Sequence, residues 1–169
     1  KHAEWAVMPA IAKRSATCEL AAVADIDPDR LSLAARYSGT KTYSDYREMI
    51  AREALDAVYV CTPVQQHLEP TIDALQAGLH VICEKPLAES AGDCRKMIEA
   101  AERDGRLLAV TFENRYQPHS ETIRRWIREG RLGTIEAIHA KHFWDGHKTR
   151  GPLAERRRRC IDVNGGLDC

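Results

Sequence analysis

The sequence has 169 residues, a length that fits one ordinary domain or one domain with part of another. Its 25 lysines and arginines balance its 25 aspartates and glutamates, so the formal net charge is zero. This balance disfavours binding of nucleic acid or of a membrane surface through bulk charge, and we expect neither partner. Hydrophobic residues make up 44% and charged residues 30%, which are values of a globular chain, and no apolar run is long enough to cross a bilayer.

The six cysteines form no CxxC pair, and a chain of this length can build a core without disulfides. Cys61 and Cys83 lie within apolar runs, where a thiol usually acts as a small buried hydrophobe. We expect reduced, structural cysteines and therefore a cytoplasmic protein. The sequence starts Lys-His-Ala-Glu-Trp, with no initiator Met and no signal-peptide pattern, so we also expect a segment upstream.

Apolar runs alternate regularly with helical patterns and turn residues along the first half of the chain. The first fifteen residues carry no strand pattern and fit the remainder of a helix. A buried strand is predicted at residues 19–26, and a helix follows to about residue 37 because Asp27 is a good N-cap and Pro28 suits a first turn. Next come a short extended segment at 41–43, a helix at 45–54 capped by Ser44, and a strand at 55–62.

The same alternation continues in the second half. A helix at 65–77 is predicted to end at Gly78, a strand follows at 79–83, and a helix at 90–103 stops at Gly105. Further on we predict a strand at 106–113, a helix at 119–129, a longer strand at 134–144 and a basic loop or domain entry at 147–159. Strands separated by helices are typical of right-handed crossovers, so the predicted fold is α/β with a doubly wound parallel sheet.

In a doubly wound sheet, ligands bind at the carboxyl ends of the strands, and polar residues follow several predicted strands here. Asp25 ends the first strand, where an acid can accept hydrogen bonds from an adenosine ribose. A glycine-rich phosphate loop belongs about 20 residues earlier, but the first glycine of the chain is Gly39. Asp25 is therefore equally well explained as part of a helix cap with Asp27.

Three more polar groups lie at the ends of later strands. Thr62 and Pro63 follow the strand at 55–62, and His67 comes next, either as a cofactor contact or as a solvated surface residue. Glu84, Lys85 and Pro86 follow the strand at 79–83, where Lys85 faces the ligand crevice or pairs with its neighbour Glu84. Residues 114–118 (Asn-Arg-Tyr-Gln-Pro) form a last cluster at the same edge.

Several segments closely resemble the Gfo/Idh/MocA family of nicotinamide-dependent sugar and inositol dehydrogenases. The resemblance covers essentially all 169 residues, and its most specific segment is AGLHVICEKPLA. The other matching segments are Ala24-Asp25, Thr62-Pro63 with His67, residues 114–118, residues 130–135 (GRLGTI) and residues 165–168 (GGLD). It implies a Rossmann domain at 1–118, lacking its first strand and glycine loop, and at 119–169 the start of an α/β substrate domain with an open, mostly antiparallel sheet that often forms the oligomer interface.

The resemblance also implies a role for each matching residue. Lys85 resembles the active-site lysine that hydrogen-bonds the substrate hydroxyl and the nicotinamide ribose, and the Lys85–Pro86 bond is expected to be cis. Asp168 resembles the first residue of a D-x-x-x-H element, whose histidine, the usual general base, falls beyond Cys169. The expected cofactor-binding residues are Asp25, Thr62, Pro63, His67, Glu84, Lys85, Asn114 and Arg115.

The expected activity is hydride transfer between a nicotinamide cofactor and a sugar, polyol or related hydroxy compound. NAD is favoured over NADP because Asp25 is followed by Ile26, which offers no cation for a 2′-phosphate. We expect an internal fragment of a longer protein that forms a homo-oligomer. Residues 1–169 alone are expected neither to bind NAD(H) tightly nor to oxidise a substrate.

The sequence also bears on two other functions and on a metal site. A phosphoacceptor receiver module needs an Asp after its central strand, but the strand at 55–62 ends in Cys-Thr-Pro. A non-catalytic family member that binds cofactor or partner stays open, and the residue at the position of the missing histidine would discriminate it. No metal is expected, because His139 and His142 on one strand point to opposite faces.

Overall fold

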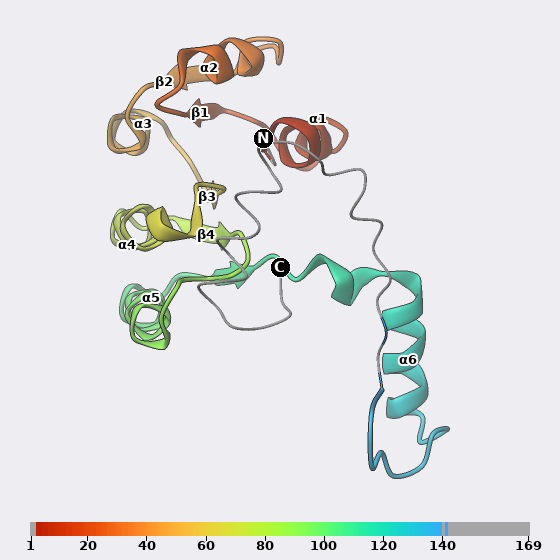
Figure 1. Cartoon of the computed structure of the whole chain (residues 1–169). Helices are drawn as coiled ribbons and strands as arrows, with labels where there is room; N and C mark the ends of the chain where they lie inside the picture. Colours follow the sequence, from red (N-terminus) through yellow and green to blue (C-terminus); the bar gives the residue numbers. More distant parts are fainter. Residues whose placement is uncertain (1–2, 140, 142–169) are drawn as a thin grey trace. The chain divides into compact units, whose positions relative to one another are not determined.

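The computed structural model describes residues 3–139 and 141 (Figure 1). The chain divides into two compact units, one of residues Lys1–Gln117 and one of Pro118–Cys169. The assignment of a cofactor domain to 1–118 and of a substrate domain to 119–169 stays a prediction.

Strands and helices alternate throughout the first unit, as the sequence pattern predicts. A π-helical turn at Ala3–Val7 leads into α1 (Met8–Ala12), so the expected N-terminal helix is present. The elements that follow are β1 (Ala22–Ala24), α2 (Pro28–Ala34), β2 (Lys41–Tyr43), α3 (Tyr46–Arg52), β3 (Ala57–Val60), a 3-10 turn (Val64–Gln66), α4 (Leu68–Gln76), β4 (His80–Cys83), α5 (Ala91–Asp104), β5 (Leu108–Val110) and a 3-10 turn (Glu113–Tyr116). The single helix expected at 65–77 is thus a 3-10 turn followed by α4.

Every strand pairing in the described residues is parallel. Strand β1 pairs with β2, and β4 lies between β3 and β5 in a second sheet. The parallel prediction is therefore confirmed, but the strands predicted at 19–26 and 55–62 lie in two separate sheets instead of in one. Helix α3 contacts both β1 and α4 and so links the two sheets. Strand–helix alternation predicts parallel crossovers and leaves open which strands are adjacent.

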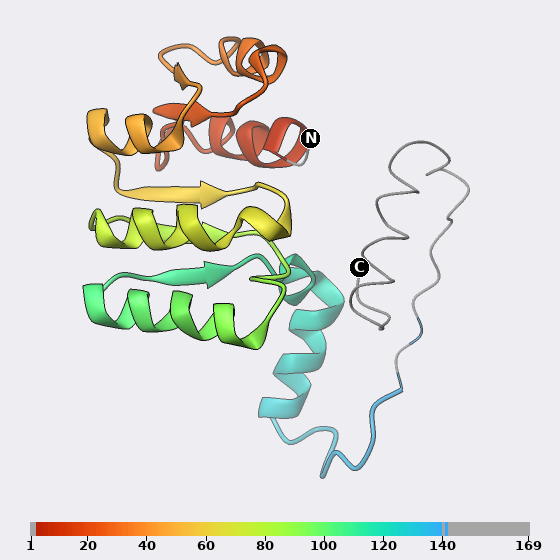
Figure 2. The ribbon, with the colours of Figure 1, turned by 60° about the vertical axis from the view of Figure 1, so that its left-hand side comes forward.

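The core lies between α4, α5 and one face of the β3–β4–β5 sheet (Figures 1 and 2). On β4, Val81 and Cys83 are buried while Ile82 is 38% exposed, because successive side chains point to opposite faces. Leu75 of α4 and Met97 of α5 are fully buried against this face. The core therefore fixes β3, β4 and β5 relative to one another and, with them, the loops at their carboxyl ends.

Short polar side chains cap α2, α3 and α5. Of the two N-caps predicted from the sequence, Asp27 is confirmed and Ser44 is wrong. Asp27 accepts a hydrogen bond from the Asp29 amide at 3.0 Å and caps α2, with Pro28 in the first turn. Helix α3 differs, since Asp45 and not Ser44 is its N-cap and accepts from the Arg47 amide at 2.8 Å. Gly105 ends α5 in the left-handed region with φ of +62°.

Ser90→Ala is expected to lower the free energy of unfolding by about 1 kcal/mol. Ser90 Oγ accepts from the Asp93 amide at 3.0 Å and donates to the Asp93 carboxylate at 2.9 Å, so alanine leaves a helical N–H of α5 without its acceptor. Urea unfolding of the two proteins measures the difference. An unchanged midpoint and slope would mean that water replaces the cap at no cost.

The second unit contains α6 (Pro118–Arg128), and Gly130 follows it with φ of +69°. The strand expected at 134–144 is absent over residues 134–139 and 141, and its remaining residues lie outside the described part. A strand is stable only with a hydrogen-bonded neighbour, and the described residues of this unit contain no other strand.

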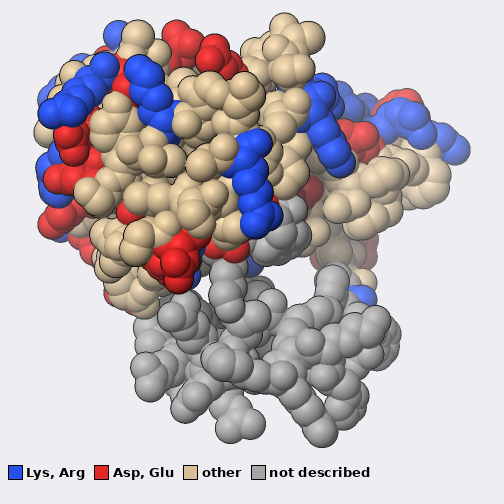
Figure 3. Space-filling model, turned by 90° about the horizontal axis from the view of Figure 1, so that it is seen from above, with Lys and Arg blue, Asp and Glu red and all other residues tan. Residues whose placement is uncertain are grey.

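The surface of the described residues carries both charge signs. On the face drawn in Figure 3, lysine and arginine side chains lie beside aspartate and glutamate, without a region of one sign. Among the described helices, none combines the length and apolarity that a bilayer crossing needs.

Candidate functional site

The predicted site residues follow the carboxyl ends of four parallel strands. In Figure 2 the arrows of β3 and β5 point in one direction, and β4 is parallel to both, so the segments after these three strands lie at one edge of their sheet. The predicted residues are Asp25 after β1, Thr62 and Pro63 after β3, Glu84 and Lys85 after β4, and Asn114 and Arg115 after β5. Asp168 lies outside the described residues.

Asp25 offers a partly exposed carboxylate directly after β1. Its amide donates to the Tyr43 carbonyl at 3.1 Å, which continues the pairing with β2. Its Oδ1 accepts from the Asp27 amide at 3.0 Å, while its side chain stays 26% exposed. Because Asp27 itself caps α2, Asp25 supports the turn before the helix and still has oxygen lone pairs for a further donor.

Arg30 is a cation that the sequence analysis missed. Its Nη1 lies 3.5 Å from Asp25 Oδ2, and its Nε lies 3.4 Å from Asp27 Oδ2 and 3.7 Å from Glu4 Oε1. The spacing of Asp27 and Arg30 on a predicted helix could have indicated the contact. No cation is next to Asp25 in the sequence, but the fold brings the Arg30 guanidinium close to it. Three carboxylates surround this guanidinium.

His67 is buried, so the solvated alternative is wrong. The residue is 1% exposed, and its ring lies between the loops that follow β3 and β4. Nε2 lies 2.9 Å from the Thr62 carbonyl, and Nδ1 lies 3.0 Å from that of Pro86 and 3.2 Å from that of Leu87. The imidazole is thus enclosed by main-chain carbonyls, and its expected role as a cofactor contact stays a prediction.

Glu84 is held by donors from its own sheet. Tyr59 of β3 donates from its hydroxyl to Glu84 Oε1 at 2.6 Å, and the Lys85 amide donates to Oε2 at 3.2 Å. Burial, and then the bond to Glu84, raise the pKa of Tyr59. Lys85 is exposed, and no described carboxylate lies within ion-pair distance of its ammonium, so the expected alternative of a Glu84–Lys85 salt bridge does not form. The Lys85–Pro86 bond is cis, as expected.

Tyr59→Phe is expected to lower the free energy of unfolding by about 1 kcal/mol at pH 7, because a charged acceptor loses its donor. The folded-state pKa of Tyr59 is raised, so its contribution is fully present below the unfolded pKa of about 10 and is lost progressively from there up to the folded pKa, because the unfolded state ionises first. Urea unfolding of both proteins at pH 7 and pH 10.5 tests this. A difference that stays constant or grows at the higher pH would contradict it.

The remaining predicted residues are exposed at the same edge. Thr62 donates to the Gln66 carbonyl at 3.0 Å, which closes the loop after β3, and Pro63 precedes the 3-10 turn. Asn114 and Arg115 lie in the 3-10 turn after β5. Burial raises the pKa of Cys61 to about 12, so the thiol beside Thr62 is protonated at neutral pH and is not a nucleophile.

The cysteines and histidines of the described residues form no reactive cluster. Cys18, Cys61, Cys83 and Cys94 are free thiols, and burial raises the pKa of Cys83 to about 11. Within the described residues, no group of three metal-ligating side chains is assembled. Cys160, Cys169, His142 and His147 lie outside them.

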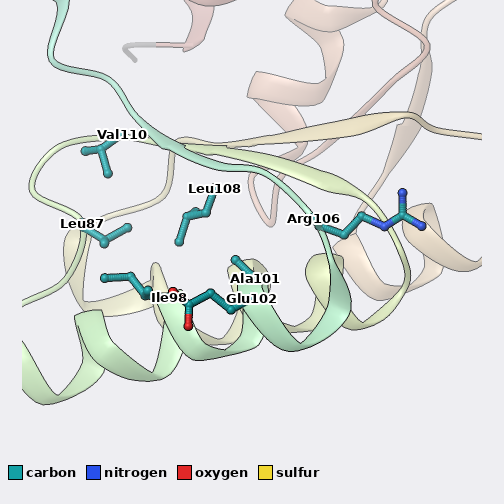
Figure 4. A pocket seen from close by; sticks show the side chains of 7 residues that line it. All are labelled: Leu87, Ile98, Ala101, Glu102, Arg106, Leu108 and Val110. Atoms are coloured by element: carbon teal, nitrogen blue, oxygen red, sulfur yellow. The ribbon is translucent and has the colours of Figure 1, made fainter.

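A cavity of about 350 Å³ lies between α5 and β5 (Figure 4). Its lining is mainly apolar, with Glu102 and Arg106 as its charged members. The other lining residues are Leu87, Ile98, Ala101, Leu108 and Val110. Ligand sites for polar cofactors need several converging polar groups, and the strand-end residues supply these better than the cavity does.

Residues 4–112 match the Gfo/Idh/MocA family model, an oxidoreductase family with an NAD-binding Rossmann fold. The chain is 36% identical over 127 residues to D-glucoside 3-dehydrogenase of Escherichia coli strain K12. The aligned region covers 73% of this chain and 35% of that protein. The chain is 32% identical over 128 residues to inositol 2-dehydrogenase of Salmonella typhimurium strain LT2, with coverages of 74% and 38%.

Solved structures agree with this match. WlbA dehydrogenase from Bordetella pertussis, in complex with NADH and UDP-GlcNAcA, superposes with a TM-score of 0.71 and 32% identity, over 75% of this chain and 37% of that one. The chain therefore spans between 35% and 38% of the length of these three proteins. The comparisons confirm the predicted α/β Rossmann class.

Proposed function

This chain belongs to the Gfo/Idh/MocA family of NAD-binding oxidoreductases, and from that premise we propose that the whole protein transfers hydride between a nicotinamide cofactor and a hydroxyl-bearing carbon of a sugar or polyol. The carrying observation is the placement of Asp25, Thr62, Lys85 and Asn114 after the carboxyl ends of parallel strands. Ligands of doubly wound sheets bind at that edge. The names of the relatives, a glucoside and an inositol dehydrogenase, support the substrate class.

The residues present fit a dinucleotide. Asp25 keeps a partly exposed carboxylate that can accept from ribose hydroxyls, and exposed polar groups follow β3, β4 and β5. We propose that Asp25 holds the adenosine ribose and that Thr62, Pro63, Asn114 and Arg115 line the path toward the nicotinamide. Glu84 orients the loop through its bonds to Tyr59 and the Lys85 amide.

We assign the central polar role to Lys85. When bound, the cofactor supplies the hydride chemistry. The ammonium of Lys85 is exposed beside β4 and carries donors for the substrate hydroxyl and the nicotinamide ribose. A donor at the reacting oxygen orients the alcohol and stabilises the negative charge that develops there as its proton leaves. Asp168 is proposed as a second catalytic group on the strength of the family resemblance alone.

The test is an activity screen of the whole protein with NAD⁺ and NADP⁺ against myo-inositol, a methyl D-glucoside, D-xylose and a sugar acid. Formation of NADH or NADPH is followed by absorbance. Turnover of at least one polyol or sugar with NAD⁺ is the expected result. Absence of turnover with tight NADH binding would favour the non-catalytic alternative, a family member that binds cofactor without chemistry.

We further propose that the protein acts in the cytoplasm as a homo-oligomer. The four free thiols of the described residues accord with a reducing compartment. Fractionation of cells and sedimentation of the whole protein test the two statements separately.

A further inference from the structure

His67 joins two loops that the sheet alone does not hold together. Its backbone is fixed at the start of α4, where its amide donates to the Val64 carbonyl and its carbonyl accepts from the Thr71 amide, both at 3.2 Å. The ring projects from this anchor between the loop at Thr62 and the loop that carries Lys85. The imidazole is therefore a link between a fixed helix and the proposed site.

The contacts of the ring are unequal. Two carbonyls, those of Pro86 and Leu87, converge on Nδ1 at 3.0 and 3.2 Å, while one, that of Thr62, faces Nε2 at 2.9 Å. Carbonyl oxygens only accept, so a contact is a hydrogen bond when the facing nitrogen carries hydrogen. A hydrogen on Nδ1 is donated to the loop that carries Lys85, and a hydrogen on Nε2 is donated to the loop at Thr62.

Lys85 lies between two anchored neighbours. On its N-terminal side, the Glu84 amide donates to the Val60 carbonyl of β3 at 2.9 Å. On its C-terminal side, the carbonyls of Pro86 and Leu87 meet the His67 ring. A second link, from Gln65 Nε2 to Glu89 Oε1 at 2.6 Å, is exposed and so contributes less than the buried one.

We propose that His67 is a positioning residue: donation from Nδ1 to the carbonyls of Pro86 and Leu87 holds the main chain that places the Lys85 ammonium. The part of this inference that concerns turnover rests on the function proposed above, whereas the loop contact rests on the geometry of His67 alone. Misplacement of a catalytic group by about 1 Å can lower a rate by about a hundred-fold, so loosening of this loop is expected to affect kcat.

Two amide substitutions separate the two sides of the ring. The amide nitrogen of Asn reaches about as far from the main chain as Nδ1, and that of Gln about as far as Nε2. His67→Asn therefore retains a donor toward Pro86 and Leu87, whereas His67→Gln retains a donor toward Thr62. Leu75→Ala is the control for lost stability, because Leu75 is fully buried on the same helix and its side chain has no group that donates to a loop carbonyl.

The first measurement is backbone amide exchange of the whole protein, which needs no substrate. For His67→Gln we expect exchange at residues 84–89 to be about five-fold faster or more than in wild type, and for His67→Asn within about two-fold. Leu75→Ala is expected to lower Tm without selective acceleration at 84–89. Equal acceleration in the Gln and Asn variants would overturn the proposal.

The second measurement is kcat with NAD⁺ and whichever of the four screening compounds the wild type oxidises fastest. His67→Gln is expected to lower kcat by about ten-fold or more with KM within about two-fold, and His67→Asn to restore most of it. A kcat that falls equally in Leu75→Ala would assign His67 to stability alone. If the wild type oxidises none of the compounds, the proposed function fails while amide exchange still decides the role of His67.

Discussion

Lys85→Met is expected to lower kcat of the whole protein by about 100-fold or more while the Kd for NADH stays within a few-fold. Methionine keeps much of the length of the side chain and removes its charge and its donors. An interaction made mainly in the transition state lowers kcat when it is lost, because ground-state binding is unaffected. Steady-state kinetics and NADH fluorescence titration measure the two quantities.

The structure offers a matched control for this substitution. Lys96 on α5 is also exposed, but its ammonium pairs with Asp93 at 2.7 Å and it lies within a helix, not in a loop after a strand. Lys96→Met is expected to leave kcat unchanged. Unchanged turnover in Lys85→Met would remove Lys85 from the mechanism, and an equal loss of NADH affinity and kcat would assign it to cofactor binding.

Local features of the sequence predicted the helices and strands because their causes are local. The cap at Asp27, the proline after it and the glycine at 105 act within a few residues, and each has its expected conformation. The apolar runs at 55–62 and 79–83 became β3 and β4 because alternating burial against α4 and α5 stabilises both. The resemblance of AGLHVICEKPLA to the family then located the segment that carries Lys85.

Features that depend on contacts between residues far apart in the chain could not be predicted from the sequence. Burial of His67 follows from the meeting of two loops, one with Thr62 five positions earlier and one with Pro86 and Leu87, 19 and 20 positions further on. The separation of β1 from β3 is a matter of strand order, which periodicity does not encode. The strand predicted at 134–144 had the right alternation, yet residues 134–139 remain without a partner strand among the described residues.

Asp25 and Arg30 illustrate the same limit at the site. In the sequence, Asp25 ends the first predicted strand and is followed by Ile26, which offers no cation for a 2′-phosphate. This pattern favoured NAD over NADP. Folding brings the Arg30 guanidinium to 3.5 Å from the carboxylate. Glu4 and Asp27 also lie within 4 Å of that guanidinium, so the local charge remains negative and still favours ribose hydroxyls over a 2′-phosphate.

Asp25→Ala is expected to weaken NADH binding by about 1–3 kcal/mol, because the ribose hydroxyls lose a charged acceptor. The same change frees Arg30 from one of its three carboxylates, so the ratio of NADPH to NADH affinity is expected to rise. Fluorescence titration with both cofactors measures these effects in the whole protein.

A comparison with two other variants separates the proposed role of Asp25 from its support of the turn. Asp25→Asn keeps an oxygen for the Asp27 amide and removes the charge, so NADH affinity should fall while urea unfolding stays close to wild type. Asp45→Ala removes the cap of α3 and should lower stability by about 1 kcal/mol with no change in cofactor affinity. If Asp25→Ala behaves like Asp45→Ala, with lower stability and unchanged NADH affinity, then Asp25 serves the turn before α2 and the ribose is held elsewhere.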